Sequence, residues 1–261
     1  MINRLCVVTF FYPGIEKKIN IFIKSLEKQF IKNFDLVIFF NNKKNFRLPK
    51  NNLNIKIFKL NTSIIKSRFK MFKKLKTLNY KYIIFQDADD LMSQNRIKIC
   101  EKLLQKYNVV INDLDIYGKK IIKKYFSKRI KVKTMVTAKD IADYNFCGMS
   151  NTSIRSECLK KIKMPINHKI KIFDWYFWTI ILSKYKGYFD NTSRVKYFVK
   201  KRSITRIPNK YSEQIALKIL NIKKSHKNEI NKLIKEKKIK NFNIFNGNKI
   251  FFNKNYNFWW E

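Results

Sequence analysis

The first half of the chain alternates continuous apolar runs with segments whose apolar residues recur every three or four positions. Uninterrupted apolar runs are typical of strands buried on both faces, and they predict strands at residues 5–11, 35–40, 82–85 and 109–111. The run at 55–60 alternates apolar and basic residues, which predicts a half-exposed strand. Helical spacing predicts helices at residues 15–30, 64–75 and about 94–107. Such strand–helix units predict an α/β protein with a mainly parallel sheet, in which ligands bind at the carboxyl ends of strands.

The second half is less regular. The basic stretch 119–133 predicts an exposed hairpin or loop, and residues 145–155 predict a loop that leads into a strand. We expect a buried helix from residue 173, a short strand at 195–199 and a long helix at about 211–238. The Asn246-Gly247 pair between two short apolar triplets predicts a β-hairpin. These features predict a main domain at 1–210 and a C-terminal helix and hairpin extension at 211–261.

The net charge is +40, from 58 Lys plus Arg against 18 Asp plus Glu. One explanation is an anionic partner such as nucleic acid or a membrane surface. The other is an A/T-rich genome, because 49 of the basic residues are Lys, whereas Gly, Pro and Ala number 5, 4 and 4. The lysines are scattered through all predicted elements and no nucleic-acid-binding motif is present, so we expect no specific nucleic-acid partner. A hydrophobic content of 45% excludes a wholly disordered polycation.

Cysteine usage and hydropathy bear on location. The four cysteines lack C-x-x-C spacing and lie in apolar or mixed segments, which favours buried, reduced thiols. The longest apolar run near the middle, 175–183, is about half of the ~20 residues that a membrane span needs. Residues 1–10 do not resemble a signal peptide. We therefore expect a cytoplasmic protein, at most peripheral on the cytoplasmic face of the membrane.

Three carboxylates follow the predicted strand 82–85 directly: Asp87, Asp89 and Asp90. Carboxylates this close repel one another, and a hard divalent cation that holds a diphosphate would neutralise them. If the segment is extended, Asp87 and Asp89 point to the same side. The alternative is an Asp-rich turn and N-cap before the next helix.

A fourth acid, Asp174, lies alone within the aromatic run 172–178. A carboxylate in such apolar surroundings is unfavourable unless it is paired or capping a helix. Burial would raise its pKa and suit it to general-base catalysis. The alternative is an ordinary helix N-cap.

The order of these segments resembles that of the family 2 glycosyltransferases. Their pattern is a first strand ending in a Thr-aromatic turn, a second ending in acidic or Asn-like residues, and an Arg-bearing helix. Phe-x-Asp-x-Asp-Asp, a Gly/Ser-rich segment and an acid opening an apolar helix follow. The matching segments are 8–12 (VTFFY), 40–42 (FNN), 66–69 (KSRF), 85–90 (FQDADD), 148–152 (GMSNT) and 173–175 (FDW). The resemblance covers about residues 4–206 and implies a GT-A fold, a Rossmann-like, mixed but mainly parallel sheet flanked by helices.

The resemblance implies an enzyme that transfers a sugar, with inversion, from a nucleotide-sugar donor to a hydroxyl of a glycan or lipid-linked acceptor in cell-surface polysaccharide synthesis. It implies that Asp87 faces the nucleoside or the metal, that Asp89 binds Mn²⁺ or Mg²⁺ on the diphosphate, and that Asp174 deprotonates the acceptor. The base pocket would be lined by Thr9, Phe10 and Tyr12.

Two further site residues keep alternatives open. Arg68 would meet the donor diphosphate or be a solvated helix residue. Trp175 would pack against an acceptor sugar or belong to the core.

Two departures from the family pattern stand out. Asn41-Asn42 replaces an acid that often holds the base or ribose, so Asn41 would bind the donor by hydrogen bonds only. Residues 197–205 (YFVKKRSIT) replace a strand that often carries Arg and His. Lys200, Lys201 or Arg202 would then meet the diphosphate, unless they only reflect the general lysine excess.

Other functions compete with this one. A basic nucleic-acid-binding protein would use the lysine excess, and a nucleotidyltransferase would use the same kind of sheet and paired carboxylates. The latter usually has a Gly-rich loop after the first strand, which Pro13-Gly14 does not supply. The long basic helix and the aromatic end 258–260 would contact an anionic membrane or pack on the main domain.

Overall fold

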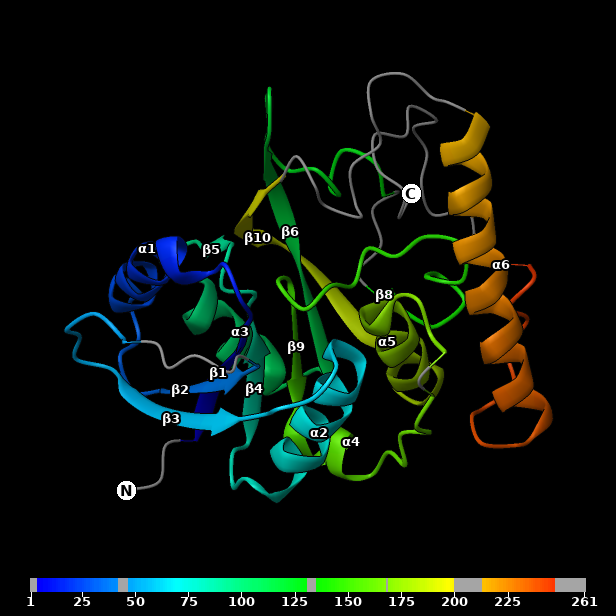
Figure 1. Ribbon diagram of the computed structural model, residues 1–261, viewed down its shortest axis with the longest axis horizontal. Helices are drawn as coiled ribbons and strands as arrows, with labels where there is room; N and C mark the ends of the chain where they lie inside the picture. Colours follow the sequence, from blue (N-terminus) through cyan, green and yellow to red (C-terminus); the bar gives the residue numbers. More distant parts are fainter. Residues whose placement is uncertain (1–3, 42–46, 131–134, 168, 200–212, 247–261) are drawn as a thin grey trace.

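The computed structural model describes residues 4–41, 47–130, 135–167, 169–199 and 213–246, with only the backbone of 213–216 (Figure 1). The segment Lys200–Arg202, the boundary at residue 210, the second arm of the expected hairpin and the aromatic end at 258–260 lie outside the described residues. Among the helices described, none combines the length and the apolar character that a membrane span requires.

One mixed sheet organises the chain, in the order β3-β2-β1-β4-β9-β6-β10-β5, with β7 beside β6 and β8 beside β10. The strands are β1 (Leu5–Phe11), β2 (Asp35–Phe40), β3 (Asn54–Lys59), β4 (Tyr82–Phe85), β5 (Leu91–Met92), β6 (Val109–Tyr117), β7 (Ile121–Ile122), β8 (Met135–Val136), β9 (Thr152–Arg155) and β10 (Gly187–Phe198). The long ladders are parallel: β1 with β2 and β4, β2 with β3, and β6 with β10. The predicted α/β class and mainly parallel sheet are therefore confirmed.

Helices cover both faces of the sheet (Figure 1). The helices are α1 (Glu16–Glu27), α2 (Ile64–Thr77), α3 (Arg96–Leu104), α4 (Ser156–Lys160), α5 (Phe173–Lys184) and α6 (Glu213–Lys235). Side chains alternate along β1, so Leu5 and Val7 pack with α1 and α3, whereas Cys6 and Val8 pack with α2 and α5. Strands covered on both faces must be apolar throughout, which explains the runs in the sequence.

Three predicted elements differ from the structure. The first helix ends at Glu27, so Phe30 does not extend its apolar face and is 63% exposed. Strand β6 continues past residue 111 through buried Asp113, whose carboxylate accepts backbone N–H groups of Leu114 and Phe126. The predicted strand 195–199 is the end of β10, which begins at Gly187. Buried polar residues interrupt the apolar pattern in both strands.

The expected hairpin near the C-terminus does not form at its first arm. The side-chain oxygen of Asn243 accepts the backbone N–H groups of Phe245 and Asn246 at 3.1 and 3.0 Å. Such an Asx turn bends the segment and prevents a strand at 243–245. The preceding helix α6 packs on α5, and its Ile230 and Leu233 belong to the same core cluster as the α5 side chains.

Candidate active site

Four acids meet at the carboxyl ends of β1 and β4. The backbone N–H of Gln86 donates to the Val8 carbonyl, which holds the two strand ends side by side. After β4 the chain turns, and the Asp90 N–H donates to the Asp87 carbonyl at 3.2 Å. The segment is therefore a turn, so the condition under which Asp87 and Asp89 would point to the same side is not met. The turn does not cap α3 either, because the N-cap residue of that helix is Asn95, with no side-chain cap.

Asp87 lies between a cation and other acids. Its Oδ1 is 3.6 Å from Nη2 of Arg68, and its Oδ2 accepts the Ser150 hydroxyl at 3.0 Å. Burial raises the pKa of Asp87 to about 6, against the lowering effect of Arg68 and with a further raising effect of Asp174 and Asp89. A bound cation would relieve the repulsion that Asp87 experiences from Asp174 and Asp89.

Asp89 is half-buried beside the end of β1. Its Oδ2 accepts the Tyr12 hydroxyl at 3.1 Å, and its backbone carbonyl is 3.4 Å from the Lys18 ammonium nitrogen. Tyr12 and Asp89 are thus brought together from positions far apart in the chain, as the shared sheet edge predicts.

Asp90 is only 2% exposed, and its carboxylate is hydrogen-bonded inside the turn. Its Oδ1 accepts the backbone N–H of Phe198, and its Oδ2 lies 2.5 Å from the Ser150 hydroxyl, which also reaches Asp87. One hydroxyl has one proton to donate, so the second contact requires a proton on a carboxyl. Burial and the two neighbouring acids raise the pKa of Asp90 well above its ordinary value.

Asp174 lies in the first turn of α5 and faces the same cluster. Its Oδ2 accepts the Met149 backbone N–H at 3.4 Å, and the N-cap residue of α5 is Ile172, so Asp174 is not the N-cap of that helix. Burial raises its pKa, whereas the Arg68 guanidinium lowers it. Arg68 therefore acts electrostatically on both Asp87 and Asp174.

Trp175 does not face an acceptor. It is fully buried, its Nε1 donates to the Ile141 carbonyl at 2.6 Å, and its ring stacks on His226 of α6 with centroids 3.9 Å apart. The prediction that Trp175 binds the acceptor is therefore wrong, and the core alternative holds.

The remaining predicted donor residues lie near the carboxyl ends of β1 and β2. The Arg68 guanidinium lies 4.5 Å above the Phe10 ring, and Phe10 is 3% exposed. Thr9 is 2% exposed, and its hydroxyl has no hydrogen-bond partner in the described part of the chain. Asn41 donates to the Thr62 carbonyl at 2.8 Å and accepts the Thr62 N–H, so its amide ties β2 to the loop before α2. Arg68 is an ion-pair partner and not a merely solvated helix residue.

Two residues that contribute to the candidate site were not predicted from the sequence. Ser150 lies within the Gly/Ser-rich segment noted above, but its bridge between two acids depends on a fold contact about sixty residues away in sequence. Arg96 is fully buried and donates to the Gln86 side chain, the Phe85 carbonyl and the Asn112 side chain. It fixes the backbone that leads into Asp87, and its place among ordinary helix residues gave no signal.

The carboxylates of Asp87 and Asp89 are suitable ligands for a hard divalent cation. Carboxylate oxygens are the ligands that Mg²⁺ and Mn²⁺ take, and a cation beside Asp87 and Asp89 would reverse the repulsion that raises the Asp87 pKa. The described residues contain no group of three or more His, Cys, Asp or Glu able to hold a metal ion. A cation here would therefore complete its shell with phosphate oxygens and water.

Comparison with proteins of known structure identifies the fold of the chain. No protein-family model and no curated protein sequence matches the chain. The Staphylococcus aureus TarS fragment 1–349 in complex with UDP-GlcNAc superimposes with a TM-score of 0.56 at 18% identity, covering 86% of this chain and 69% of that one. The chain has the GT-A glycosyltransferase fold.

A second solved structure shares the GT-A fold. GalNAc-T7 with UDP, GalNAc and Mn²⁺ matches with a TM-score of 0.50 at 12% identity, covering 77% of this chain and 45% of that one. The chain spans 60% of TarS 1–349 in one structure and 41% of the longer TarS structure. Similarity at these identities extends to the fold.

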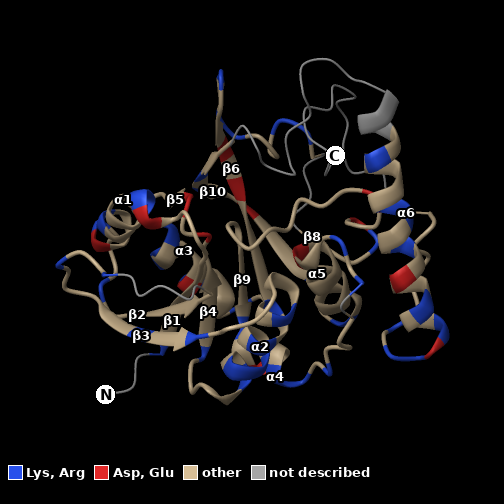
Figure 2. Cartoon of the chain, viewed as in Figure 1, with Lys and Arg blue, Asp and Glu red and all other residues tan. Residues whose placement is uncertain are grey.

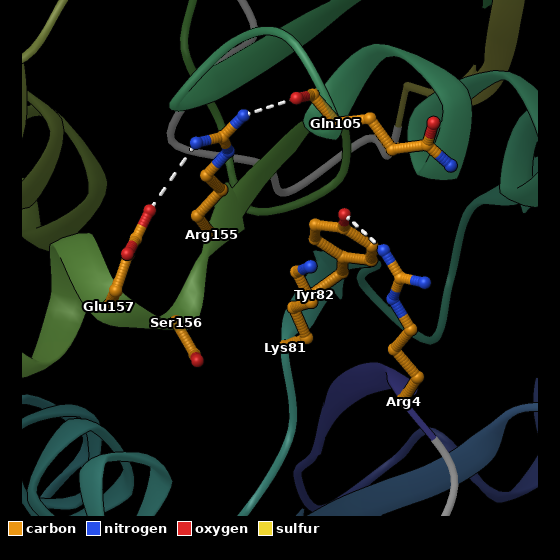
Figure 3. A pocket seen from close by; sticks show the side chains of 7 residues that line it. All are labelled: Arg4, Lys81, Tyr82, Gln105, Arg155, Ser156 and Glu157. Carbon is orange, nitrogen blue, oxygen red and sulfur yellow. Dashed lines mark hydrogen bonds and ion pairs between the residues drawn. The ribbon is translucent and has the colours of Figure 1, made fainter.

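The opposite edge of the sheet holds a different cavity, of about 400 Å³ (Figure 3). The Arg4 guanidinium donates to the Tyr82 hydroxyl at 2.8 Å. Arg155 donates to the Leu104 and Gln105 carbonyls at 2.6 and 2.5 Å and lies 3.4 Å from Glu157. The guanidinium groups of Arg4 and Arg155 thus already have hydrogen-bond partners. The cavity lies at the amino end of β4, away from Asp87.

Proposed function

We propose that this protein is an inverting glycosyltransferase that moves a sugar from a nucleoside-diphosphate donor to an acceptor hydroxyl. The observation that carries the proposal is the convergence of Asp87, Asp89 and Asp174 around Arg68 at the carboxyl edge of a GT-A fold. TarS and GalNAc-T7 each bind UDP or a UDP-sugar, which supports a nucleotide-sugar donor here.

The donor lies across the ends of β1 and β4 in this proposal. Thr9 and Phe10 form the floor beneath it, whereas Tyr12 and the backbone held by Asn41 border the nucleotide. Asp87 and Asp89 would hold Mn²⁺ or Mg²⁺, and this cation would neutralise charge on the leaving diphosphate. Arg68 adds a second positive charge, 3.6 Å from Asp87 and therefore beside the same diphosphate.

Asp174 is the general base of the proposed reaction. Its carboxylate removes the proton of the acceptor hydroxyl as that oxygen attacks the anomeric carbon. The bond from the anomeric carbon to the diphosphate oxygen breaks on the opposite side, and the nucleoside diphosphate leaves with the electron pair. A raised pKa brings Asp174 closer to the pKa range that suits proton transfer.

The biological setting follows from the same proposal. The acceptor is a glycan or a lipid-linked glycan of a cell-surface polysaccharide, and transfer takes place on the cytoplasmic side, with peripheral membrane contact. A nucleic-acid-binding function has no specific support, because Lys and Arg are spread over nearly all elements (Figure 2). No observation favours a nucleotidyltransferase.

A nucleotide screen tests the proposal. Thermal unfolding is followed with UDP-, GDP- and dTDP-sugars, each with and without MnCl₂. We expect one base class to raise the Tm only when Mn²⁺ is present, and the Asp89→Ala variant to lose this increase. Absence of stabilisation by every nucleotide in the wild type would overturn the proposal.

A further inference from the structure

The hydroxyl of Ser150 lies between two acids of the candidate site. It is 3.0 Å from Oδ2 of Asp87 and 2.5 Å from Oδ2 of Asp90. Ser150 is only 4% exposed, so bulk water does not compete for these contacts. A buried hydroxyl that contacts two carboxylates restricts the orientation of both, and Asp87 is one of the two acids that the proposed function assigns to the cation.

The backbone around Ser150 is fixed by the side chain of Asn151. The Asn151 side-chain oxygen accepts the Gly148 N–H at 2.8 Å. Its amide nitrogen donates to the carbonyls of Asn112 and Phe146 at 2.9 and 3.1 Å. Asn151 is 2% exposed, so these hydrogen bonds are made in the interior. Ser150 is therefore carried by a rigid backbone, which a residue that orients another side chain requires.

Asp90 holds the Ser150 hydroxyl from the other side. Its Oδ1 accepts the backbone N–H of Phe198 at 2.9 Å, which ties Asp90 to the end of β10. The contacts thus run from β10 through Asp90 and Ser150 to Asp87. The orientation of the Asp87 carboxylate is therefore determined by the folded chain rather than by solvent.

Arg68 competes for the same carboxylate. Its Nη2 is 3.6 Å from Oδ1 of Asp87, which is longer than a hydrogen bond. A guanidinium and a carboxylate bind most strongly when two parallel N–H groups meet both oxygens. The last torsion of an aspartate side chain is soft, so without Ser150 the carboxylate of Asp87 could turn both oxygens towards Arg68. The Ser150 contact at Oδ2 opposes that closed ion pair.

We infer that Ser150 is a positioning residue for the cation site, because its hydroxyl keeps Asp87 out of a closed ion pair with Arg68 and leaves the carboxylate available to Mn²⁺ or Mg²⁺. This role rests on the proposed function and deepens it. Loss of a hydrogen bond to a ligating carboxylate typically weakens metal binding by about 10- to 100-fold, so one buried hydroxyl has a measurable effect.

Titration of the whole protein with MnCl₂, without nucleotide, tests this role. Electron paramagnetic resonance measures the unbound Mn²⁺, and circular dichroism checks that each variant is folded. We expect Ser150→Ala to weaken Mn²⁺ binding by about tenfold or more. Ser150→Thr keeps the hydroxyl and should bind Mn²⁺ more tightly than Ser150→Ala does.

Thr152→Val is the matched control. Thr152 is fully buried two residues further along the same segment, and its hydroxyl has no hydrogen-bond partner among the residues that the structure describes. Removal of this hydroxyl should change the Mn²⁺ affinity by less than about twofold, because no ligand depends on it. Equal losses in Ser150→Ala and Thr152→Val would overturn the assignment of Ser150.

A double-mutant cycle with Arg68→Met separates positioning from a merely structural role. In the Arg68→Met background no guanidinium competes for Asp87, so Ser150→Ala should weaken Mn²⁺ binding by less than about threefold there. The same loss in both backgrounds would contradict the inference, because Ser150 would then act independently of Arg68.

The outcome is separable from that of the nucleotide screen. Mn²⁺-dependent stabilisation by a nucleotide sugar, together with equal Mn²⁺ affinities of the wild type and Ser150→Ala, would remove the role of Ser150 alone. Ser150-dependent Mn²⁺ binding without any nucleotide effect would overturn the glycosyltransferase proposal and leave a cation site that Ser150 orients. Absence of Mn²⁺ binding by the wild type, with and without nucleotide, would overturn the inference.

Discussion

The two ends of β4 carry opposite electrostatic arrangements. At the carboxyl end, Asp87, Asp89, Asp90 and Asp174 repel one another around Arg68, and the pKa values of three of them are raised. At the amino end, Arg4 and Arg155 already meet hydroxyl, carbonyl and carboxylate oxygens (Figure 3). Mutually repelling charges thus mark the end that is proposed to bind the donor, whereas paired charges mark the opposite end.

The sharpest test of this comparison is Asp174→Asn. We expect kcat to fall by about 10² to 10⁴, because the proposed base is lost, while the affinity for the donor changes little. Stability should be unchanged or slightly higher, since burial disfavours the charged form. Release of nucleoside diphosphate, measured with the donor found by thermal unfolding, gives kcat.

Asp143→Asn is the control, because Asp143 pairs with Lys227, which lies on α6 outside the site. It should keep full turnover. Wild-type turnover in Asp174→Asn would contradict the assignment of the base.

Arg96→Met tests whether buried charge behind the site is structural. We expect a loss of about 3 kcal/mol in the free energy of unfolding, because the oxygens of Gln86, Phe85 and Asn112 lose their donor in the interior. Urea unfolding followed by circular dichroism measures the loss. The exposed neighbour Lys98→Met should stay within about 0.5 kcal/mol of wild type, and a similar value for Arg96→Met would show that the network is not structural.

The acidic end predicts a pH dependence of stability. Burial raises the pKa of Asp87 from 3.8 to about 6, so the folded state binds this proton more tightly than the unfolded chain does. The stabilisation is therefore full below pH 3.8 and is lost as the pH rises through about 6, by an amount on the order of 3 kcal/mol.

Urea unfolding in EDTA at several pH values measures this slope. Asp87→Asn should flatten it in part, because Asp90 and Asp174 shift in the same direction. Mn²⁺ with the nucleotide should also flatten it, because a cation favours the charged carboxylate. An identical slope in Asp87→Asn would contradict the account.

The smallest effect is expected at the amino end. Arg155→Ala removes a side chain that caps the C-terminus of α3 through two carbonyls, at a loss of about 1 kcal/mol in the free energy of unfolding. Turnover should be unchanged. A fall in kcat comparable with that of Asp174→Asn would show that the two ends do not differ in the way described.

Much of the fold could be predicted because the central strands are apolar on both faces. Residues 5–11, 35–40 and 82–85 form strands as expected. The extent of β6 and β10 could not be predicted, since Asp113 and Asp190 are buried there with hydrogen-bond partners that only the folded chain supplies. A buried acid and an exposed one look the same in a sequence.

The site shows the same division. Asp87, Asp89 and Asp174 could be named because carboxyl ends of strands and the head of an apolar helix are positions with a physical meaning. The Ser150 bridge and the Arg96 network could not, because each depends on tertiary contacts between distant segments. Trp175 was misassigned for the opposite reason, since an aromatic residue beside a proposed catalytic acid can belong wholly to the interior.

The stack of Trp175 on His226 has a consequence for where the chain can be cut. Nine of the twelve residues of α5 are buried, and α6 covers part of that surface with His226, Ile230 and Leu233. A protein shortened to residues 1–210 would present this aromatic surface to water, and we expect it to associate or precipitate. The smallest soluble unit should therefore include α6, because α6 covers part of the hydrophobic interior that α5 contributes to.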